Sequence, residues 1–582
     1  MSRFASFARP HAGRYGAGLV LLLVTNGLSL WLPWLLRDAI QAMERGVELS
    51  VIGGYAAAMT AVACAQAVVR VASRLIVLGA SRRIAADVRD RYFDRLLRFG
   101  ATYYDTHRTG DIMSRGVNDV QLLQSFYGPG LMNLMNTAIV YVAVIVLLLR
   151  IDVTLTLISL ALFPVLFAAV NRISRSVYAR SLAVQEQLAA ISDRVQENVS
   201  GIQQVKIYVQ EEREIEGFRA LCAEYRRRNL SMAALRGGMI SLIGVVSGVG
   251  TLIVLLIGGR FVMQGRIGFG DFVAFNAYLG LLAWPTIALG WIINVFQRGA
   301  GAMQRICEVL DERSDVPSPL DAQDDALDAV PIDGDIEVRG LTFSYAGERG
   351  QAQLRDVNLR IPRGSRVALV GPVGSGKSTL ANLLARFYPV PPGTVFIGGT
   401  DINDIPLVRL RRGIGYVPQE AFLFSRSLRE NIALGQPTAS EDEIARAVEM
   451  SHLTSDLAVF PRGLDTTVGE RGFTLSGGQR QRTTLARAVI GDRKILILDD
   501  SLSSVDADTE RAILDQIHRR ARDRTLLLIS HRMSTLARMD RILVMDRGRI
   551  VEDGTHDELM ARKGVYEELF LRHELERRLT GS

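Results

Sequence analysis

Long apolar runs dominate the first 300 residues of the chain. Six stretches lack Asp, Glu, Lys and Arg: 17–36, 51–69, 131–149, 153–171, 237–259 and 272–297. Each is close to the roughly 20 helical residues that cross a hydrocarbon core about 30 Å thick. Six such stretches in one half of a chain favour membrane spans over buried helices of a soluble protein. The pattern therefore predicts an all-α, six-helix transmembrane domain over residues 1–310.

The segments between these stretches predict the orientation of the domain. Three connections are short, whereas segments 70–130 and 172–236 are long and rich in arginine. Cytoplasmic loops carry an excess of Lys and Arg, so we expect both long segments and both termini in the cytoplasm. Their helical pattern is largely free of proline, which predicts long cytoplasmic helical extensions. We expect these extensions to turn near 111–119 and 199–208.

A few polar residues within or beside the spans are candidates for a translocation path. Polar groups inside membrane segments are often functional. The asparagines could instead hydrogen-bond between helices, and the arginines could extend to the membrane surface. None of them names a substrate. The candidates are Asn26, Asn136, Asn276, Asn294, Arg70 and Arg74.

The second part of the chain has a different composition. Residues 311–335 hold nine Asp and Glu and three prolines, which is typical of a solvated linker. Residues 336–575 alternate short apolar strands with helices, as in an α/β domain. The net charge of +7 is accounted for by the arginine-rich cytoplasmic segments, so we expect no nucleic-acid partner. The three cysteines are far apart and predict neither a disulfide framework nor a metal cluster.

The clearest chemistry of this domain is a glycine-rich loop between the apolar strand 367–370 and a helix. The pattern G-x-x-x-x-G-K-[ST] wraps phosphates with backbone N–H groups at a helix N-terminus. Lys377 would reach the β- and γ-phosphates, and the Ser378 hydroxyl would bind Mg²⁺. The residues predicted to bind nucleotide here are Gly371, Gly374, Ser375, Gly376, Lys377, Ser378 and Thr379.

Two further patterns follow the glycine-rich loop. Four apolar residues, 495–498, form a predicted buried parallel strand that ends in Asp499 and Asp500. Asp499 is therefore a candidate Mg²⁺ ligand. Between the two patterns, Ser476, Gly477, Gly478 and Gln479 precede a helical run and form a second possible phosphate site at a helix N-terminus.

The segment Leu475–Gln479, LSGGQ, between these two patterns resembles the signature of the ABC ATPase family. Most of the chain is similar to an ABC exporter of the multidrug and lipid exporter type. The resemblance implies a P-loop ABC ATPase that binds ATP and Mg²⁺ and hydrolyses ATP. It also implies roles for five more residues: Tyr345 stacks on adenine, Gln419 senses Mg²⁺ and the attacking water, Glu470 faces a cytoplasmic hairpin, Asp506 lies in the D-loop, and His531 contacts the γ-phosphate.

One position departs from the family pattern. In the family, the residue after the aspartate that corresponds to Asp499 is usually a glutamate that acts as general base. Here that position is Asp500. A shorter side chain draws the carboxylate back by about 1 Å, and a misplacement of that size can lower the rate of catalysis on the order of 10²-fold. The resemblance implies catalytic roles for Asp500, His531 and Gln419. It also implies a heterodimer, in which a second ABC half-transporter carries the glutamate. The alternative is a homodimer in which a small backbone shift lets Asp500 act.

The predicted function is ATP-driven export of amphipathic or hydrophobic compounds, such as a drug, lipid or peptide, across the inner (plasma) membrane. Two alternatives stay open: an exporter-fold importer of a metal chelate such as a siderophore, and an ATP-gated regulatory or channel-like protein. The six apolar stretches exclude a soluble ABC ATPase of DNA repair.

Overall fold

The computed structural model describes residues 2–316, 332–345, 352–469, 472, 474–520 and 523–580. It divides into two compact units, one formed by Met1–Leu96 with Gly110–Glu312 and the other by Leu97–Thr109 with Arg313–Ser582. Most of the predicted acidic linker, residues 317–331, lies outside the described residues. The short segment 97–109 is the part of the N-terminal half that belongs to the second unit.

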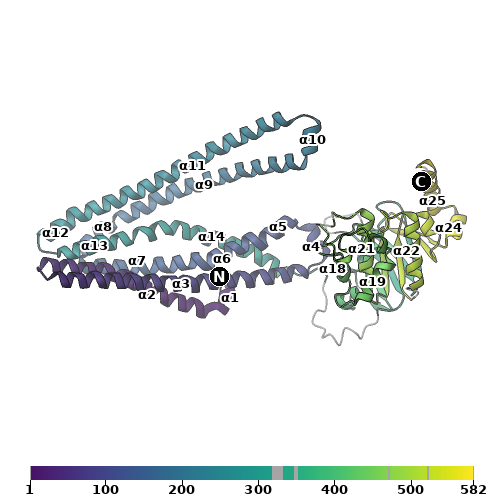
Figure 1. Cartoon of the computed structure of the whole chain (residues 1–582), viewed down its shortest axis with the longest axis horizontal. Helices are drawn as coiled ribbons and strands as arrows, with labels where there is room; N and C mark the ends of the chain where they lie inside the picture. The colour runs from purple at the N-terminus through teal and green to yellow at the C-terminus, as the bar shows by residue number, and fades with distance from the viewer. Residues whose placement is uncertain are drawn as a thin grey trace. The chain divides into compact units, whose positions relative to one another are not determined.

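The first unit is built from long helices (Figure 1). All six predicted spans fall within them. The helices are α1 (Ser2–Ala8), η1 (Arg9–His11), α2 (Ala12–Glu44), α3 (Leu49–Leu97), α5 (Thr109–Ser114), η2 (Arg115–Asp119), α6 (Val120–Ser125), η3 (Phe126–Gly130), α7 (Leu131–Ile151), α8 (Val153–Leu160), α9 (Leu162–Ser200), α10 (Ile202–Ile207), α11 (Glu211–Ile253), η4 (Val254–Gly258), α12 (Gly259–Met263), α13 (Phe269–Leu281) and α14 (Ala283–Asp311).

The count of six membrane helices is only partly supported. Among the described residues, four helical stretches are long and apolar enough to cross a membrane: Arg3–Glu44, Leu49–Leu97, Thr109–Ile151 and Phe269–Asp311. The predicted spans 153–171 and 237–259 are helical, but several of their side chains lie outside the described residues. The shorter apolar helix Gly248–Met263 covers part of the latter span.

Only one of the two predicted hairpin turns lies at its expected position in the structure. The second lies where expected, because α9 and α11 run side by side and are joined by α10 (Figure 1). The first was expected near 111–119 and is wrong, because Thr109–Ile151 is one continuous helical stretch. The chain turns earlier, around α4 (Ala101–Thr106), which begins after the extended Gly100. A Cβ at Gly100 would lie 2.5 Å from Asp315 Oδ1, so this close approach requires glycine.

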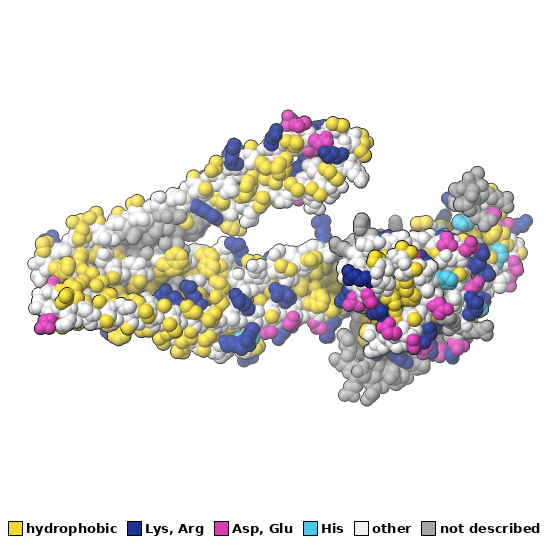
Figure 2. Space-filling model, viewed as in Figure 1, with side chains coloured by type: hydrophobic (Ala, Val, Ile, Leu, Met, Phe, Trp, Pro, Cys, Tyr) yellow, Lys and Arg dark blue, Asp and Glu magenta, His cyan; other side chains and the backbone are white. Residues whose placement is uncertain are grey.

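The helices of the first unit are joined by apolar packing and a few polar contacts. One buried cluster includes Ile84, Leu123 and Ile306, from α3, α6 and α14. The Tyr278 hydroxyl donates to the Leu30 carbonyl at 2.8 Å and ties α13 to α2. In Figure 2, hydrophobic side chains dominate the surface near α12 and α13, while charged side chains gather on the α9–α11 hairpin near α10. An apolar outer surface is what a helix in lipid requires.

The second unit has an α/β architecture with two sheets. Its antiparallel sheet has the order β2-β1-β4-β5, and its six-stranded, largely parallel sheet has the order β10-β9-β3-β8-β7-β6. The strands are β1 (Ile336–Phe343), β2 (Leu354–Ile361), β3 (Arg366–Val370), β4 (Val395–Ile397), β5 (Thr400–Asp401), β6 (Ile414–Val417), β7 (Ile495–Asp499), β8 (Thr525–Ile529), β9 (Arg541–Asp546) and β10 (Arg549–Gly554).

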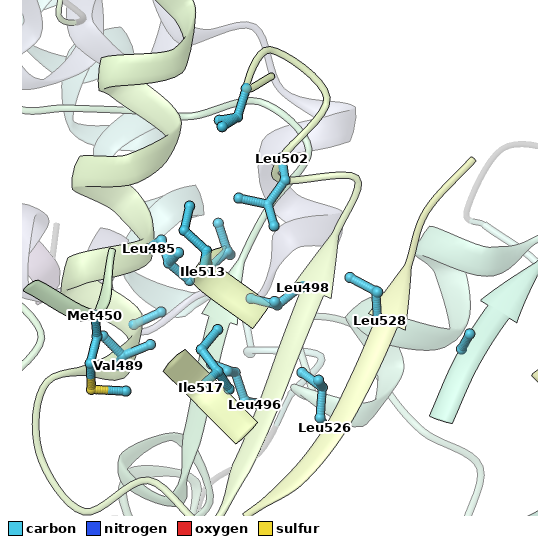
Figure 3. Packing of buried hydrophobic residues seen from close by; sticks show 14 of the residues in the cluster. Met450, Leu485, Val489, Leu496, Leu498, Leu502, Ile513, Ile517, Leu526 and Leu528 are labelled. Carbon is cyan, nitrogen blue, oxygen red and sulfur yellow. The ribbon is translucent and has the colours of Figure 1, made fainter. Parts of the chain in front are cut away.

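Helices cover the larger sheet and form the main core of this unit. Figure 3 shows Leu485 and Val489, from one helix, and Ile513 and Ile517, from another, packing against β7 and β8. The helices are α16 (Lys377–Leu384), α17 (Leu407–Gly413), α18 (Leu428–Ala433), α19 (Glu441–Met450), α20 (Thr454–Leu457), η5 (Gly463–Asp465), α21 (Gly477–Val489), α22 (Ala507–Arg520), α23 (Met533–Leu536), α24 (His556–Arg562) and α25 (Val565–Thr580).

The order of the parallel strands decides where the functional residues meet. Strand β8 lies between β3 and β7, and the three strands are parallel. Arg366 of β3 pairs with Leu526 of β8, and Ile495 of β7 pairs with Thr525 of β8. The carboxyl ends of parallel strands lie at one edge of a sheet, where α/β proteins bind ligands. The glycine-rich loop, the aspartate pair and the loop after β8 therefore share this edge.

Candidate functional site

The glycine-rich loop has a backbone that only glycine adopts easily. Gly371, Gly374 and Gly376 have φ angles of +150°, +80° and +101°. A Cβ at Gly371 would lie 2.0 Å from the Met545 carbonyl oxygen, so no side chain fits there. The loop ends at Gly376, and α16 begins at Lys377 with its N-terminal N–H groups available to an anion. The predicted phosphate loop is thus a strand-loop-helix unit.

Lys377 lies buried inside this loop. Its Nζ donates to the carbonyl oxygens of Gly371 at 2.9 Å and Pro372 at 2.8 Å. Burial lowers the pKa of Lys377, while the nearby carboxylates of Asp499 and Asp500 act in the opposite direction. A cation held this way has only weak neutral partners, so an arriving phosphate is a stronger acceptor than either carbonyl.

Ser378 and Asp499 form a pair beside the lysine. The Ser378 Oγ donates to Asp499 Oδ1 at 3.1 Å, and Asp499 is only 3% exposed. Burial raises the pKa of the Asp499 carboxyl, and the neighbouring Asp500 adds to that rise. A buried carboxylate next to a hydroxyl is a hard oxygen donor set of the kind that Mg²⁺ takes together with phosphate oxygens. The residues present therefore fit the predicted metal.

Asp500 and His531 face one cavity at the edge of the sheet. The cavity, about 160 Å³ in volume, is lined by both residues and by Glu510, Arg532 and His573. Asp500 has a left-handed backbone with φ of +43°, and its N–H donates to the Ile529 carbonyl at 2.9 Å. Burial raises the pKa of the Asp500 carboxyl and lowers the pKa of the His531 imidazole. Both groups are therefore pushed toward their neutral forms.

The ion pair between Glu510 and Arg532, which the sequence did not predict, forms part of the lining of this cavity. Glu510 is 2% exposed, pairs with Arg532, and accepts a hydrogen bond from the Thr535 hydroxyl at 2.8 Å. Arg532 also donates to the Ser503 carbonyl at 2.9 Å. The pair thus connects α22, the loop after β7 and the loop that carries His531. A glutamate in the first turn of a helix is too common for the sequence to single out.

Tyr345 is connected to the phosphate loop from the other side. Its hydroxyl donates to Thr379 Oγ1 at 3.0 Å, and its ring packs edge-on against Tyr388 with centroids 5.0 Å apart. Tyr388 was not predicted, and its hydroxyl donates to Asp105 of α4 at 2.8 Å. Burial and this aspartate raise the pKa of Tyr388. The ATPase core therefore contacts α4 directly.

Among the described residues, Gln419 and Asp506 form no hydrogen bond with Lys377, Asp499 or His531. Gln419 follows β6 and is exposed, and within the described ranges it makes no hydrogen bond to Asp499 or Asp500. Glu470 lies outside the described residues. Asp506 is exposed and accepts a hydrogen bond from the Thr509 N–H at 2.9 Å, which lowers its pKa.

The signature segment forms the N-terminus of α21. The Ser476 hydroxyl accepts from the Gln479 N–H at 3.2 Å, and the Gln479 side chain accepts from the Ser476 N–H at 3.0 Å. A Cβ on Gly478 would lie 3.0 Å from the Ser504 carbonyl, so the glycines allow close packing on the loop after β7. In the described part of this chain, Ser476–Gln479 make no hydrogen bond to the phosphate loop.

Comparisons with known proteins agree with this geometry. Residues 15–286 match the family described as ABC transporter transmembrane region, and residues 354–503 match the family described as ABC transporter. The Bacillus subtilis (strain 168) protein named "Probable multidrug resistance ABC transporter ATP-binding/permease protein YheI" is 34% identical over 577 residues, which cover 99% of this chain and 98% of that protein. The Escherichia coli (strain K12) "Multidrug resistance-like ATP-binding protein MdlA" is 33% identical over 571 residues, covering 97% and 95%.

A solved structure supports the same conclusion. The structure of a bacterial Atm1-family ABC exporter with ATP bound superposes with a TM-score of 0.82 at 26% identity, covering 96% of this chain and 99% of the other. The chain belongs to the ABC transporters. It joins an exporter-type transmembrane domain to an ATPase domain, and it hydrolyses ATP in coupling to transport. The resemblance stated from the signature is confirmed at this level.

Proposed function

We propose that this chain is one half of a dimeric exporter that moves amphipathic or hydrophobic compounds out of the cell across the cytoplasmic membrane. Full-length similarity to proteins named for multidrug resistance carries this proposal. It extends to six membrane crossings, with both termini and the ATPase domain in the cytoplasm, because the arginine-rich segments 70–130 and 172–236 flank the apolar stretches. The metal-chelate importer and the ATP-gated channel have no comparable support.

The division of the ATPase residues supports a dimer. Lys377, Asp499 and Asp500 gather at one edge of the sheet, whereas Ser476–Gln479 bond to other parts of the chain. A nucleotide on the phosphate loop would meet the signature of a second chain.

The tip of the α9–α11 hairpin also favours a second chain. Ile207, Tyr208 and Val209 follow one another at this tip and are 73%, 71% and 78% exposed. Such an apolar patch at the end of a charged hairpin is typical of a protein contact.

The roles of the site residues follow from their contacts. Lys377 would exchange its carbonyl partners for phosphate oxygens. Ser378, Asp499 and Gln419 would hold Mg²⁺, which neutralises phosphate charge and polarises the phosphoryl group when bound. Tyr345 would bind the adenine ring. Asp500 in its ionised form, made a stronger base because burial raises its pKa, would accept the proton of the attacking water, and His531 would orient the reacting groups.

Asp500 supports the more specific proposal of a heterodimer. The left-handed backbone and the bond to Ile529 hold its Cα in place, so the shorter side chain cannot be extended by a free backbone shift. Left-handed positions favour Asp and Asn among non-glycine residues. We infer that this chain supplies the weaker hydrolysis site and an intact signature for the partner's site.

ATP turnover of the purified chain by itself tests the heterodimer. We expect turnover lower than that of the complete transporter by about 10²-fold. Asp500→Glu in the complete transporter should raise turnover, and Asp500→Asn should change the total little because the partner's site dominates. Brisk turnover of this chain alone, abolished by Asp500→Asn, would show a competent homodimer instead.

A further inference from the structure

A cavity of about 280 Å³, lined by both polar and apolar residues, lies among the membrane helices of the first unit. Its lining comes from α2, α3, α7, α13 and α14. Four of the six polar residues singled out from the sequence meet there: Asn26, Arg70, Arg74 and Asn136. The other two, Asn276 and Asn294, are not part of the lining. Residues from separate parts of the chain thus converge on one place.

In the part of the chain that the structure describes, Arg70 and Arg74 carry positive charge without a carboxylate partner. Arg70 and Arg74 are four residues apart on α3, so they project from the same face of the helix. Across the described residues, neither arginine makes a hydrogen bond or ion pair, and the lining contains no Asp or Glu. Arginine beside an apolar span is costly unless a cavity or a counter-ion receives it. An anion from outside the protein would supply that partner.

An asparagine pair adds a further hydrogen-bond donor to the same cavity. Asn26 Nδ2 donates to Asn136 Oδ1 at 3.0 Å and to the Leu22 carbonyl at 2.9 Å. This bond joins α2 to α7 and confirms the interhelical alternative for these two residues. It leaves the Asn136 Nδ2 without a partner in the part of the chain that the structure describes.

Thr25, Ser29 and Asn133 also line the cavity, and the other lining residues are apolar. The apolar ones include Leu281 and Trp284, and Trp284 is 70% exposed. An indole offers a large flat surface for an apolar group. Pockets that enclose drug-sized ligands usually measure about 300–1,000 Å³. A cavity slightly below that range suits a charged head group and the start of an apolar body.

We propose that this cavity binds the anionic head group of an amphipathic ligand, a carboxylate, sulfonate or phosphate, between Arg70, Arg74 and Asn136. The apolar body of the ligand extends along Leu281 and Trp284. This inference rests on the proposed export function and deepens it, because it names amphipathic anions as the substrate class. Guanidinium groups suit such ligands because they bind carboxylate and phosphate oxygens in pairs.

Binding of a matched pair of fluorescent probes tests the site. Dansyl-undecanoic acid and its methyl ester share one apolar body and differ in the carboxylate. We would titrate both into the purified transporter, this chain with its partner, in phosphatidylcholine nanodiscs. We expect the acid to bind roughly 10-fold or more tightly than the ester. Arg70→Gln with Arg74→Gln should remove that preference while ester binding stays.

Two further variants make the result specific. Arg82→Gln with Arg83→Gln removes the same charge from α3 outside the cavity and should keep the preference for the acid. Asn136→Asp keeps the side-chain size and the Asn26 bond but introduces a carboxylate, and should weaken acid binding alone. Equal affinity of acid and ester in the unaltered protein, or the same loss in the Arg82 and Arg83 variant, overturns the proposal.

Two more experiments address separate questions. The first asks whether the bound anion is a lipid or a soluble compound, and the second tests the proposed export function. Nanodiscs that contain phosphatidylglycerol show whether a lipid head group competes with the acid in the unaltered protein but not in the Arg70 and Arg74 variant. Such competition supports the anion site with lipid as its ligand, and its absence supports a soluble substrate. ATP-dependent uptake into inverted vesicles tests export separately, because acid binding without any transport contradicts the export function and leaves the site intact.

Discussion

At the scale of single residues, Asp500 combines a short side chain, a left-handed backbone and a partly buried carboxyl. The φ of +43° and the hydrogen bond to Ile529 define its position, and burial raises its pKa. Partly buried carboxylates with a raised pKa reduce stability at neutral pH, because folding removes water from the charged form. The proposed catalytic residue therefore opposes folding of the nucleotide-free protein.

Asp500→Asn should accordingly stabilise the nucleotide-free chain. Because the pKa of Asp500 is raised in the folded state, ionisation of its carboxyl lowers the free energy of unfolding at pH values above that pKa. The neutral amide of Asn has no such cost. We expect Tm to rise by about 1–4 °C at pH 7. The gain should shrink as pH falls toward 4 and both side chains become neutral. Thermal unfolding of both proteins from pH 4 to pH 8 measures this.

Asp492→Asn is the matched control for that experiment. The pKa of Asp492 is lowered, first by its hydrogen bond to Lys494, so its ionised form favours folding above the usual pKa of 3.8. Its loss should leave Tm at pH 7 unchanged or slightly lower, since exposed pairs contribute little. A Tm at pH 7 that falls for Asp500→Asn would contradict our account of the Asp500 environment.

At the scale of secondary-structure elements, α4 is the feature that links the two halves of the sequence. It belongs to the segment Leu97–Thr109, which packs with the ATPase unit. Its backbone is joined to that unit by the bond from the Ala101 N–H to the Phe387 carbonyl at 3.0 Å. The Tyr388 hydroxyl adds the bond to Asp105 at 2.8 Å. Because Tyr388 also packs on Tyr345, a single aromatic pair separates α4 from the phosphate loop.

Tyr388→Phe should weaken communication between α4 and the ATPase site. The substitution removes one hydrogen bond, worth about 1 kcal/mol, and keeps the ring packing. We expect nucleotide affinity to stay the same and substrate-stimulated ATP turnover to fall several-fold. Tyr416→Phe is the control, because it removes a comparable bond to Asn382 Oδ1 at 2.8 Å inside the ATPase unit. Equal effects of the two substitutions would rule out a specific role for the α4 contact.

At the scale of the whole molecule, the exposed tip of the α9–α11 hairpin predicts how two chains meet. Ile207 is 73% exposed and contributes little to the stability of this chain. Ile207→Ser should therefore leave Tm unchanged but lower ATP turnover of the complete transporter by several-fold. Val459→Ser removes a side chain of similar exposure, 77%, from the ATPase unit and serves as the control. Full activity of the Ile207 variant would show that the tip makes no contact between chains.

Much of this protein was predictable from the sequence because its signals are local. A hydrocarbon layer requires long runs without charge, and a phosphate loop requires glycines at fixed spacing before a helix. The apolar stretches, the phosphate loop and the aspartate at the end of β7 follow from such patterns. The first hairpin turn was misplaced because Gly100 turns the chain where Asp315, distant in sequence, approaches it closely.

The tertiary structure alone decided which distant residues are neighbours. Asp500 and His531 share a cavity because β7 and β8 are adjacent parallel strands. The sequence of one strand does not reveal which other strand lies beside it. The ion pair Glu510–Arg532 and the contact of Tyr388 with Asp105 depend on packing between separate elements. Likewise, the sequence showed Asn26, Arg70, Arg74 and Asn136 as scattered polar residues. Helix packing brings them to one cavity, because only side chains on facing sides of neighbouring helices can meet.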